Sequence, residues 1–65
     1  WNGKMLQTGT IMSNNEYSCI ISFEGSCFVN GKEIPEMDYA DLKQSKEYDI
    51  VVPDNSSIAF FELCS

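Results

Sequence analysis

The ionisable side chains limit the chemistry that this chain can perform. It contains no histidine and no arginine, and its four lysines face ten carboxylates, which gives a formal net charge of −6. Histidine is the side chain that titrates near neutral pH, and arginine is the usual partner of phosphate groups. Proton-transfer catalysis is therefore disfavoured, and so is direct binding to nucleic acid or to an anionic membrane.

Three pairs of carboxylates lie close enough in the sequence to be considered for acid–base catalysis. Nothing marks one of them as buried with a raised pKa, so a solvated acidic rim is the expected role. Serine and cysteine nucleophiles lack a histidine that could activate them, and we predict no catalytic residue. The pairs are Glu33 and Glu36, Asp38 and Asp41, and Glu47 and Asp49.

Cysteine occurs at three positions, Cys19, Cys27 and Cys64. An odd number without a Cys-x-x-Cys pair is typical of reduced thiols, which predicts a cytoplasmic, intracellular protein. The same residues offer no metal site, because histidine is missing from the sequence and the cysteines are widely spaced. We expect the thiols to be small buried apolar groups, and we expect neither a metal nor another cofactor.

Aromatic and amide side chains are better candidates for binding than for catalysis. A tyrosine combines a flat apolar ring with a polar tip, and polar turn residues can hydrogen-bond a ligand. The same tyrosines could instead pack in the core, and the turn residues could bond their own backbone. The candidate ligand-binding residues are Tyr17, Tyr39, Tyr48, Asn55, Ser56 and Ser57.

Alternation of polar and apolar residues predicts the strands that must position these side chains. Over 17–23 the odd positions carry the larger apolar side chains, and the even positions place two serines and an isoleucine on the other face. Glu24-Gly25 predicts a tight turn into a strand over 26–29, which would set Cys19 opposite Asn30 and Cys27 opposite Ser22.

Asn30-Gly31 predicts a second hairpin, into a strand over 32–34 that Pro35 ends. The segment 36–43 fits either a short helix or an edge strand, and we favour the extended form. The remaining segments are a strand over 5–12 broken at Gly9, turns over 44–47 and 54–57, and strands over 48–52 and 58–63.

Together these elements predict one all-β domain over 1–65, a small antiparallel roll of about six or seven short strands. The last strand is apolar on both faces, which indicates either a central strand or a subunit interface. So short a chain has a marginal core, and we expect a homo-oligomer, at least a dimer. The candidate interface residues are Ile58, Phe60, Phe61 and Leu63.

The segments 17–34 and 48–61 resemble the two motifs of the cupin superfamily, nearest to small single-domain pyrimidine/purine nucleoside phosphorylases. The resemblance implies a cupin-like, half jelly-roll fold. It is partial, because Glu47 stands where cupins commonly have glycine and Ile58 stands near the position of a metal-binding histidine. The metal-dependent activities of cupins are accordingly not implied.

Three functions follow from these observations. The first is a non-enzymatic, acidic β-roll binding module that acts as a homo-oligomer and binds a small polar or aromatic ligand of nucleoside type, or a partner protein. The second is a reduced nucleoside phosphorylase. The third is an acidic inhibitor that engages the basic surface of a nucleic-acid-binding or host-defence protein, as small viral inhibitors do.

Overall fold

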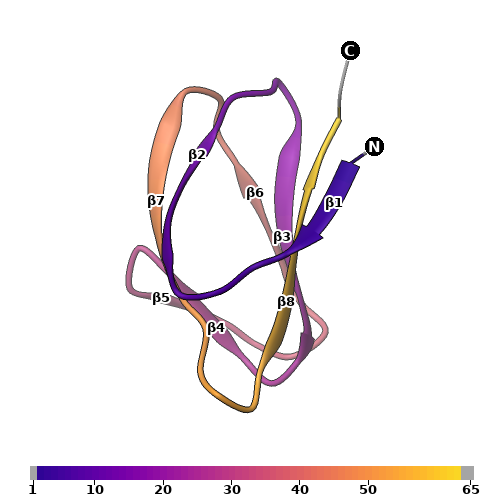
Figure 1. The fold of residues 1–65 in the computed structure, drawn as a ribbon, viewed down its shortest axis with the longest axis vertical. Helices are drawn as coiled ribbons and strands as arrows, with labels where there is room; N and C mark the ends of the chain where they lie inside the picture. The colour runs from indigo at the N-terminus through magenta and orange to yellow at the C-terminus, as the bar shows by residue number, and fades with distance from the viewer. Residues whose placement is uncertain (1, 64–65) are drawn as a thin grey trace.

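The computed structural model describes residues 2–63, and Cys64 lies outside them. All regular elements of this part of the chain are β-strands, and none forms a helix that could cross a membrane. It holds eight strands, which corrects the expected six or seven (Figure 1). They are β1 (Asn2–Met5), β2 (Gly9–Ser13), β3 (Ser18–Glu24), β4 (Cys27–Val29), β5 (Lys32–Ile34), β6 (Tyr39–Leu42), β7 (Lys46–Val51) and β8 (Ser57–Glu62).

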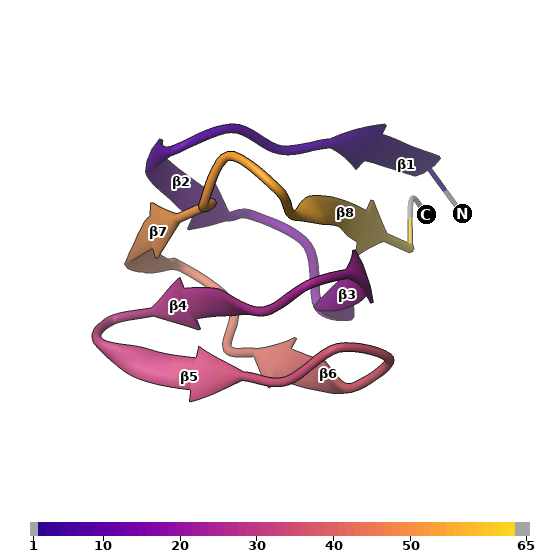
Figure 2. The same cartoon turned by 90° about the horizontal axis from the view of Figure 1, so that it is seen from below.

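The strands of residues 2–63 form two antiparallel sheets of four. Sheet A has the order β1-β8-β3-β6, and sheet B has the order β2-β7-β4-β5 (Figure 2). The first half of the chain pairs with the second half in reverse order, β1 with β8, β2 with β7, β3 with β6 and β4 with β5. The described chain is thus a long antiparallel ribbon, closed at the β4–β5 hairpin and rolled into two layers.

The β4–β5 hairpin confirms the prediction made from Asn30-Gly31. Val29 pairs with Lys32, so the loop has two residues, and both have positive φ, 51° at Asn30 and 81° at Gly31. Two successive positive φ values define the type I′ turn, whose twist matches that of the flanking strands. The side chain of Asn30 also accepts a hydrogen bond of 2.8 Å from the backbone N–H of Asp49, which ties the turn to β7.

The hairpin expected at Glu24-Gly25 is wrong. The chain crosses there from sheet A to sheet B, and β3 pairs with β6 and β8 instead of β4. Cys19 therefore lies opposite Asp41 and Phe61 and not opposite Asn30. A register shift in the pairing of β3 with β8, just before the crossing, bends the strand out of its sheet.

The strand pairing decides the conformation of two further segments. The extended alternative for 36–43 is confirmed, because β6 is an edge strand of sheet A entered through Met37 at φ 66°. The single strand expected over 5–12 is in fact two strands, β1 and β2, in different sheets. The break falls at residues 6–8, and Gly9 begins β2 instead of interrupting it.

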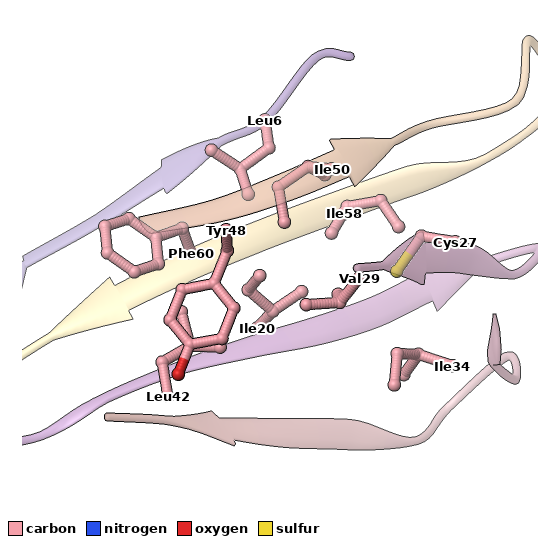
Figure 3. Packing of buried hydrophobic residues seen from close by; sticks show 10 residues of the cluster. All are labelled: Leu6, Ile20, Cys27, Val29, Ile34, Leu42, Tyr48, Ile50, Ile58 and Phe60. Carbon is pink, nitrogen blue, oxygen red and sulfur yellow. The ribbon is translucent and has the colours of Figure 1, made fainter. Parts of the chain in front are cut away.

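The core fills the space between the sheets and draws on both of them (Figure 3). Its central residues are fully or almost fully buried, and the ring of Tyr48 stands among aliphatic side chains of sheet A. Side chains therefore fill the space between the two sheets. The buried cluster consists of Leu6, Ile20, Cys27, Val29, Ile34, Leu42, Tyr48, Ile50, Ile58 and Phe60.

The face of β3 that points inward is the even one, the reverse of what the larger apolar side chains suggested. Ser18, Ile20 and Ser22 are buried, whereas Phe23 is exposed. The two serines are tolerated inside because both are hydrogen-bonded: Ser18 bonds the hydroxyl of Ser13 on sheet B, and Ser22 Oγ lies 3.3 Å from the carbonyl oxygen of Ile34. These contacts join the two sheets and offset the cost of burying hydroxyl groups.

Candidate ligand-binding groove

A groove opens where the edge strands β5 and β6 lie at the same end of the roll (Figure 2). Its volume is about 350 Å³, enough for a small ring-shaped molecule. Here β6 is the edge strand of sheet A and β5 is the edge strand of sheet B, and residues 35–38 connect the two edges. The buried side chains that line the groove are Val29, Ile34, Leu42 and Tyr48.

The rim of the groove is acidic. Three carboxylates, Glu33, Asp38 and Asp41, line it against a single lysine, Lys32. The carboxylate of Asp38 also accepts a 2.8 Å hydrogen bond from the backbone N–H of Tyr39, which fixes it at the start of β6. The combination of apolar lining and negative rim favours a ligand that has an apolar body and a positive charge.

Two of the predicted tyrosines meet at this groove. Tyr39 is 61% exposed on the rim, whereas Tyr48 is buried and presents only part of its ring. The hydroxyl of Tyr48 accepts a 2.7 Å hydrogen bond from the backbone N–H of Lys43, and its own proton can still be donated. Lys46 lies over the same ring, with Nζ 5.4 Å from the centroid. Tyr39 is therefore the side chain able to stack on a ligand.

The other predicted ligand-binding residues lie elsewhere. Tyr17 borders a shallower hollow of about 220 Å³ beside Cys19, and Ser56 and Ser57 border a third hollow, next to the β1–β2 connection. Ser56 Oγ donates to the carbonyl oxygen of Ser26 at 2.6 Å, and Ser57 Oγ donates to Glu24 at 3.2 Å. These hydroxyls hold the turn against the crossing after β3. Their partners lie 30 and 33 residues away in the sequence, whereas the turn-chemistry alternative expected bonds within the turn's own backbone.

Asn55 is exposed in the turn over 54–57, beside that third hollow but not among its lining residues.

The candidate interface residues separate into two groups. Ile58 and Phe60 belong to the chain's own core, at 0% and 3% exposure, so Phe61 and Leu63 are the members that reach the surface.

No described group of three or more cysteine and carboxylate side chains is placed to hold a metal ion. Cys27 is a buried free thiol that packs in the core beside the hydroxyl of Ser22, at 3.3 Å. Cys19 is a free thiol as well, partly buried on the outer side of sheet A. Burial raises the pKa of the Cys19 thiol, and the negative charge of Asp41 on the neighbouring strand raises it further.

Replacing Asp41 by asparagine should make Cys19 more reactive. Removing the carboxylate lowers the pKa of the thiol, so a larger fraction is thiolate at pH 8, and the thiolate is the nucleophile. In a Cys64→Ser background we expect faster alkylation by iodoacetamide at pH 8, with the rate–pH curve displaced to lower pH. The matched control is Asp49→Asn on sheet B, which should leave the rate unchanged. An unchanged curve for Asp41→Asn would contradict this account.

Several groove residues were not singled out as binding residues from the sequence. Glu33, Asp38 and Asp41 are exposed, as the sequence predicts for a solvated rim, and they converge on one groove, which the sequence does not indicate. The sequence signal that bears most directly on the groove is the Asn30-Gly31 turn. It predicts the β4–β5 hairpin, and β5 is the edge strand of sheet B that borders the groove. The proximity of β5 and β6 depends on the rolling of the ribbon, which no local pattern reports.

No protein-family model matches the chain, and searches of curated proteins and of solved structures return no match. The resemblance to cupins stays a prediction.

Proposed function

We propose that this protein is a non-enzymatic binding module whose ligand occupies the groove between β5 and β6. The observation that supports this function is the convergence of an apolar lining, an exposed tyrosine ring and three carboxylates at one opening. The ligand class is a ring compound with a positive charge: the ring covers the apolar lining and stacks on Tyr39, and the charge faces the acidic rim.

The winding of the ribbon supports a relationship to jelly rolls, and we propose that the fold is cupin-like in this sense. The space that would hold a ligand inside a wider roll is occupied here by side chains such as Ile20, Tyr48 and Phe60. The groove at the open end is a concave site that combines an exposed ring with three carboxylates on its rim. A cytoplasmic location stays a prediction based on the reduced thiols.

Titration calorimetry with a small panel tests this function. The panel consists of tryptamine (a cationic ring compound), uridine (neutral) and uridine monophosphate (anionic). We expect the affinity to fall in that order, because the acidic rim attracts the cationic ligand, has little effect on the neutral one and repels the anionic one. Absence of binding by every member, or tightest binding of the nucleotide, would overturn the proposed ligand class.

Replacing Tyr39 by alanine should weaken tryptamine binding about fivefold, since an aromatic pair contributes roughly 1 kcal/mol beyond area burial. The matched control is Tyr17→Ala, which removes a similarly exposed ring at 56% from a different hollow. Unfolding curves of both variants should overlay that of the wild type. Equal losses of affinity in the two variants would contradict a site at the groove.

A second function is favoured by the outer face of sheet B. Glu47 and Asp49 alternate along β7 with the core residues Tyr48 and Ile50, so both carboxylates point to solvent on the same face. This supports an acidic inhibitor that covers the basic surface of a nucleic-acid-binding protein. Such binding should weaken steeply between about 50 and about 500 mM salt, and salt-insensitive association would argue against it.

The phosphorylase alternative stays a prediction without a favouring observation in the described residues. Its phosphate would have to bind at the turn over 54–57, where Asp54 opposes an anion. A coupled assay with inosine or uridine and phosphate tests it, and turnover that disappears in Asn55→Ala would revive it.

A further inference from the structure

The outer faces of the two sheets differ in chemistry. On sheet B the outward residues of β7 include two carboxylates, as an antiparallel sheet with a solvated face requires. On sheet A one row of paired residues crosses all four strands, and each of its members is apolar or aromatic: Met5, Ala59, Ile21 and Tyr39. The arrangement on β3 is inverted, because its serines point inward and its larger apolar side chains point outward.

This row is a surface and not a second core. Met5 and Tyr39, at its two ends, are each 61% exposed, Ile21 is half-buried, and the small side chain of Ala59 is 3% exposed. Phe23, on the same strand as Ile21, is exposed as well. The ring of Phe61 lies flat against Gly3 in the adjacent row, since a Cβ at that glycine would come within 2.6 Å of it. A largely apolar sheet face that no described segment covers, with Asp41 as a carboxylate at its β6 edge, indicates a binding surface.

From this face we infer that a second copy of the chain covers sheet A, forming a two-fold symmetric dimer of stacked sheets. The inference deepens the homo-oligomeric part of the proposed function by naming its surface, and it does not depend on the ligand. Sheets stacked in this way lie about 10 Å apart with their strands nearly aligned.

The side chains of this row are complementary in size to those of the same row in a second copy, when the two rows face each other in opposite order. The two-fold axis runs parallel to the strands, between the stacked sheets and midway between β8 and β3. It places the row of one copy against the row of the second copy in reverse strand order, so that β1 faces β6 and β8 faces β3. Met5 then faces Tyr39 of the second copy, and Ala59 faces Ile21 of the second copy. A flexible thioether meets an aromatic ring, and a small side chain meets a branched one, so both pairs fill the gap between the sheets without overlap.

The distribution of charge allows a second copy, which has the same negative net charge, to bind at sheet A. Stacking on sheet A leaves the two sheet B faces on opposite outer sides, about three sheet spacings or roughly 30 Å apart. That separation is several times the screening length at physiological salt, so repulsion between the outward carboxylates of the two sheet B faces, Glu47 and Asp49, does not prevent association. A basic partner would instead be attracted to the carboxylates of sheet B. The uncharged row on sheet A is therefore suited to self-association.

Sedimentation velocity from about 1 to about 500 µM tests this surface. The patch is small beside the roughly 800 Å² that each partner of a stable complex buries, so we expect a dimer of micromolar affinity. Ile21→Thr keeps a β-branched side chain but removes apolar surface, and should weaken the dimer at least tenfold. The control Val51→Thr alters sheet B at a residue that is 48% exposed, and should leave the dimer intact. Near-UV circular dichroism reports that both variants are folded.

A second measurement identifies the face directly. In a Cys64→Ser background, Cys19 of one copy lies beside the two-fold axis, within reach of a bismaleimide linker of about 10 Å that joins it to Cys19 of the second copy. A covalent dimer is expected, and Cys19→Ser should abolish it. In that Cys19→Ser background, a cysteine introduced by Val51→Cys should not cross-link.

A wild-type chain that remains monomeric throughout overturns the inference, whether the face then binds lipid vesicles or another protein. An undiminished dimer in Ile21→Thr also overturns it. Because Tyr39 belongs both to the row and to the groove, the tryptamine titration is repeated with Ile21→Thr, in which the ring is not covered by a second copy. Binding by that variant reports on the groove whatever the oligomeric state of the wild type.

Discussion

Replacing Ile20 by aspartate is expected to leave the chain unfolded at 25 °C. Ile20 is 0% exposed and lies at the centre of sheet A, between Phe60 and Ala40. Losing its buried side chain costs about 2–5 kcal/mol, and burying an unpaired carboxylate adds several more. A core of this size supplies only about 3–5 kcal/mol of net stability, so the substitution exceeds the whole margin. Collapse of amide dispersion in an NMR spectrum, with loss of the near-UV signal, would show it.

The matched control is Ile21→Asp, one residue further along the same strand. Ile21 faces outward, so the carboxylate reaches water and the chain should remain folded, with a cost near the 1 kcal/mol span of strand propensities. The same variant should be monomeric if sheet A is the dimer surface. A reversal, with Ile21→Asp unfolded and Ile20→Asp native, would show that β3 is turned the other way and would refute the described packing.

Replacing Gly25 by alanine is expected to destabilise the fold by about 2–3 kcal/mol. Gly25 has φ 66°, a left-handed conformation that costs an alanine about 1–2 kcal/mol. The added Cβ would lie 2.5 Å from Ser56 Oγ and 3.2 Å from the carbonyl oxygen of Asn55. To make room, the hydroxyl of Ser56 must give up its bond to Ser26, which costs about a further 1 kcal/mol. Thermal unfolding should shift downward by roughly 10–25 °C.

Gly31→Ala separates the conformational cost from the clash. Gly31 has φ 81°, yet nothing lies within 4 Å of a Cβ added there. Only the left-handed strain remains, and the unfolding temperature should fall by about 4–12 °C. If the two glycines respond equally, the contact between the crossing after β3 and the turn over 54–57 is not as described.

Turn chemistry and alternation identified most strands of this fold, because these are local properties. Asn30-Gly31 gave the hairpin correctly, since two positive φ values suit these residues and few others. Glu24-Gly25 has an equally good turn residue, but Gly25 serves a crossing between sheets. The difference lies in the bulge after Ser22 and in the packing of Gly25 against Ser56, which are tertiary features.

Local sequence patterns also do not show which face of β3 points into the core. Counting apolar side chains favours the odd face, yet Ser18 and Ser22 face inward because Ser13 and the backbone of Ile34 supply hydrogen-bond partners from the other sheet. The candidate site depended on the same kind of information. Of the six candidate ligand-binding residues, Tyr39 and Tyr48 lie at one groove, whereas the residues of the turn over 54–57 lie beside a different hollow.

The pairing of the first half of the chain with the second half has a consequence for how the molecule folds. Only the β4–β5 hairpin joins strands that are neighbours in sequence, so it is the cheapest loop to close and the natural nucleus. From it the ribbon can zip outward through β3–β6 and β2–β7 to β1–β8, each step closing a short additional loop. Folding dominated by such distant pairings is slow, in the range of milliseconds to seconds. During synthesis sheet A cannot be completed until β8, which lies between β1 and β3, has left the ribosome.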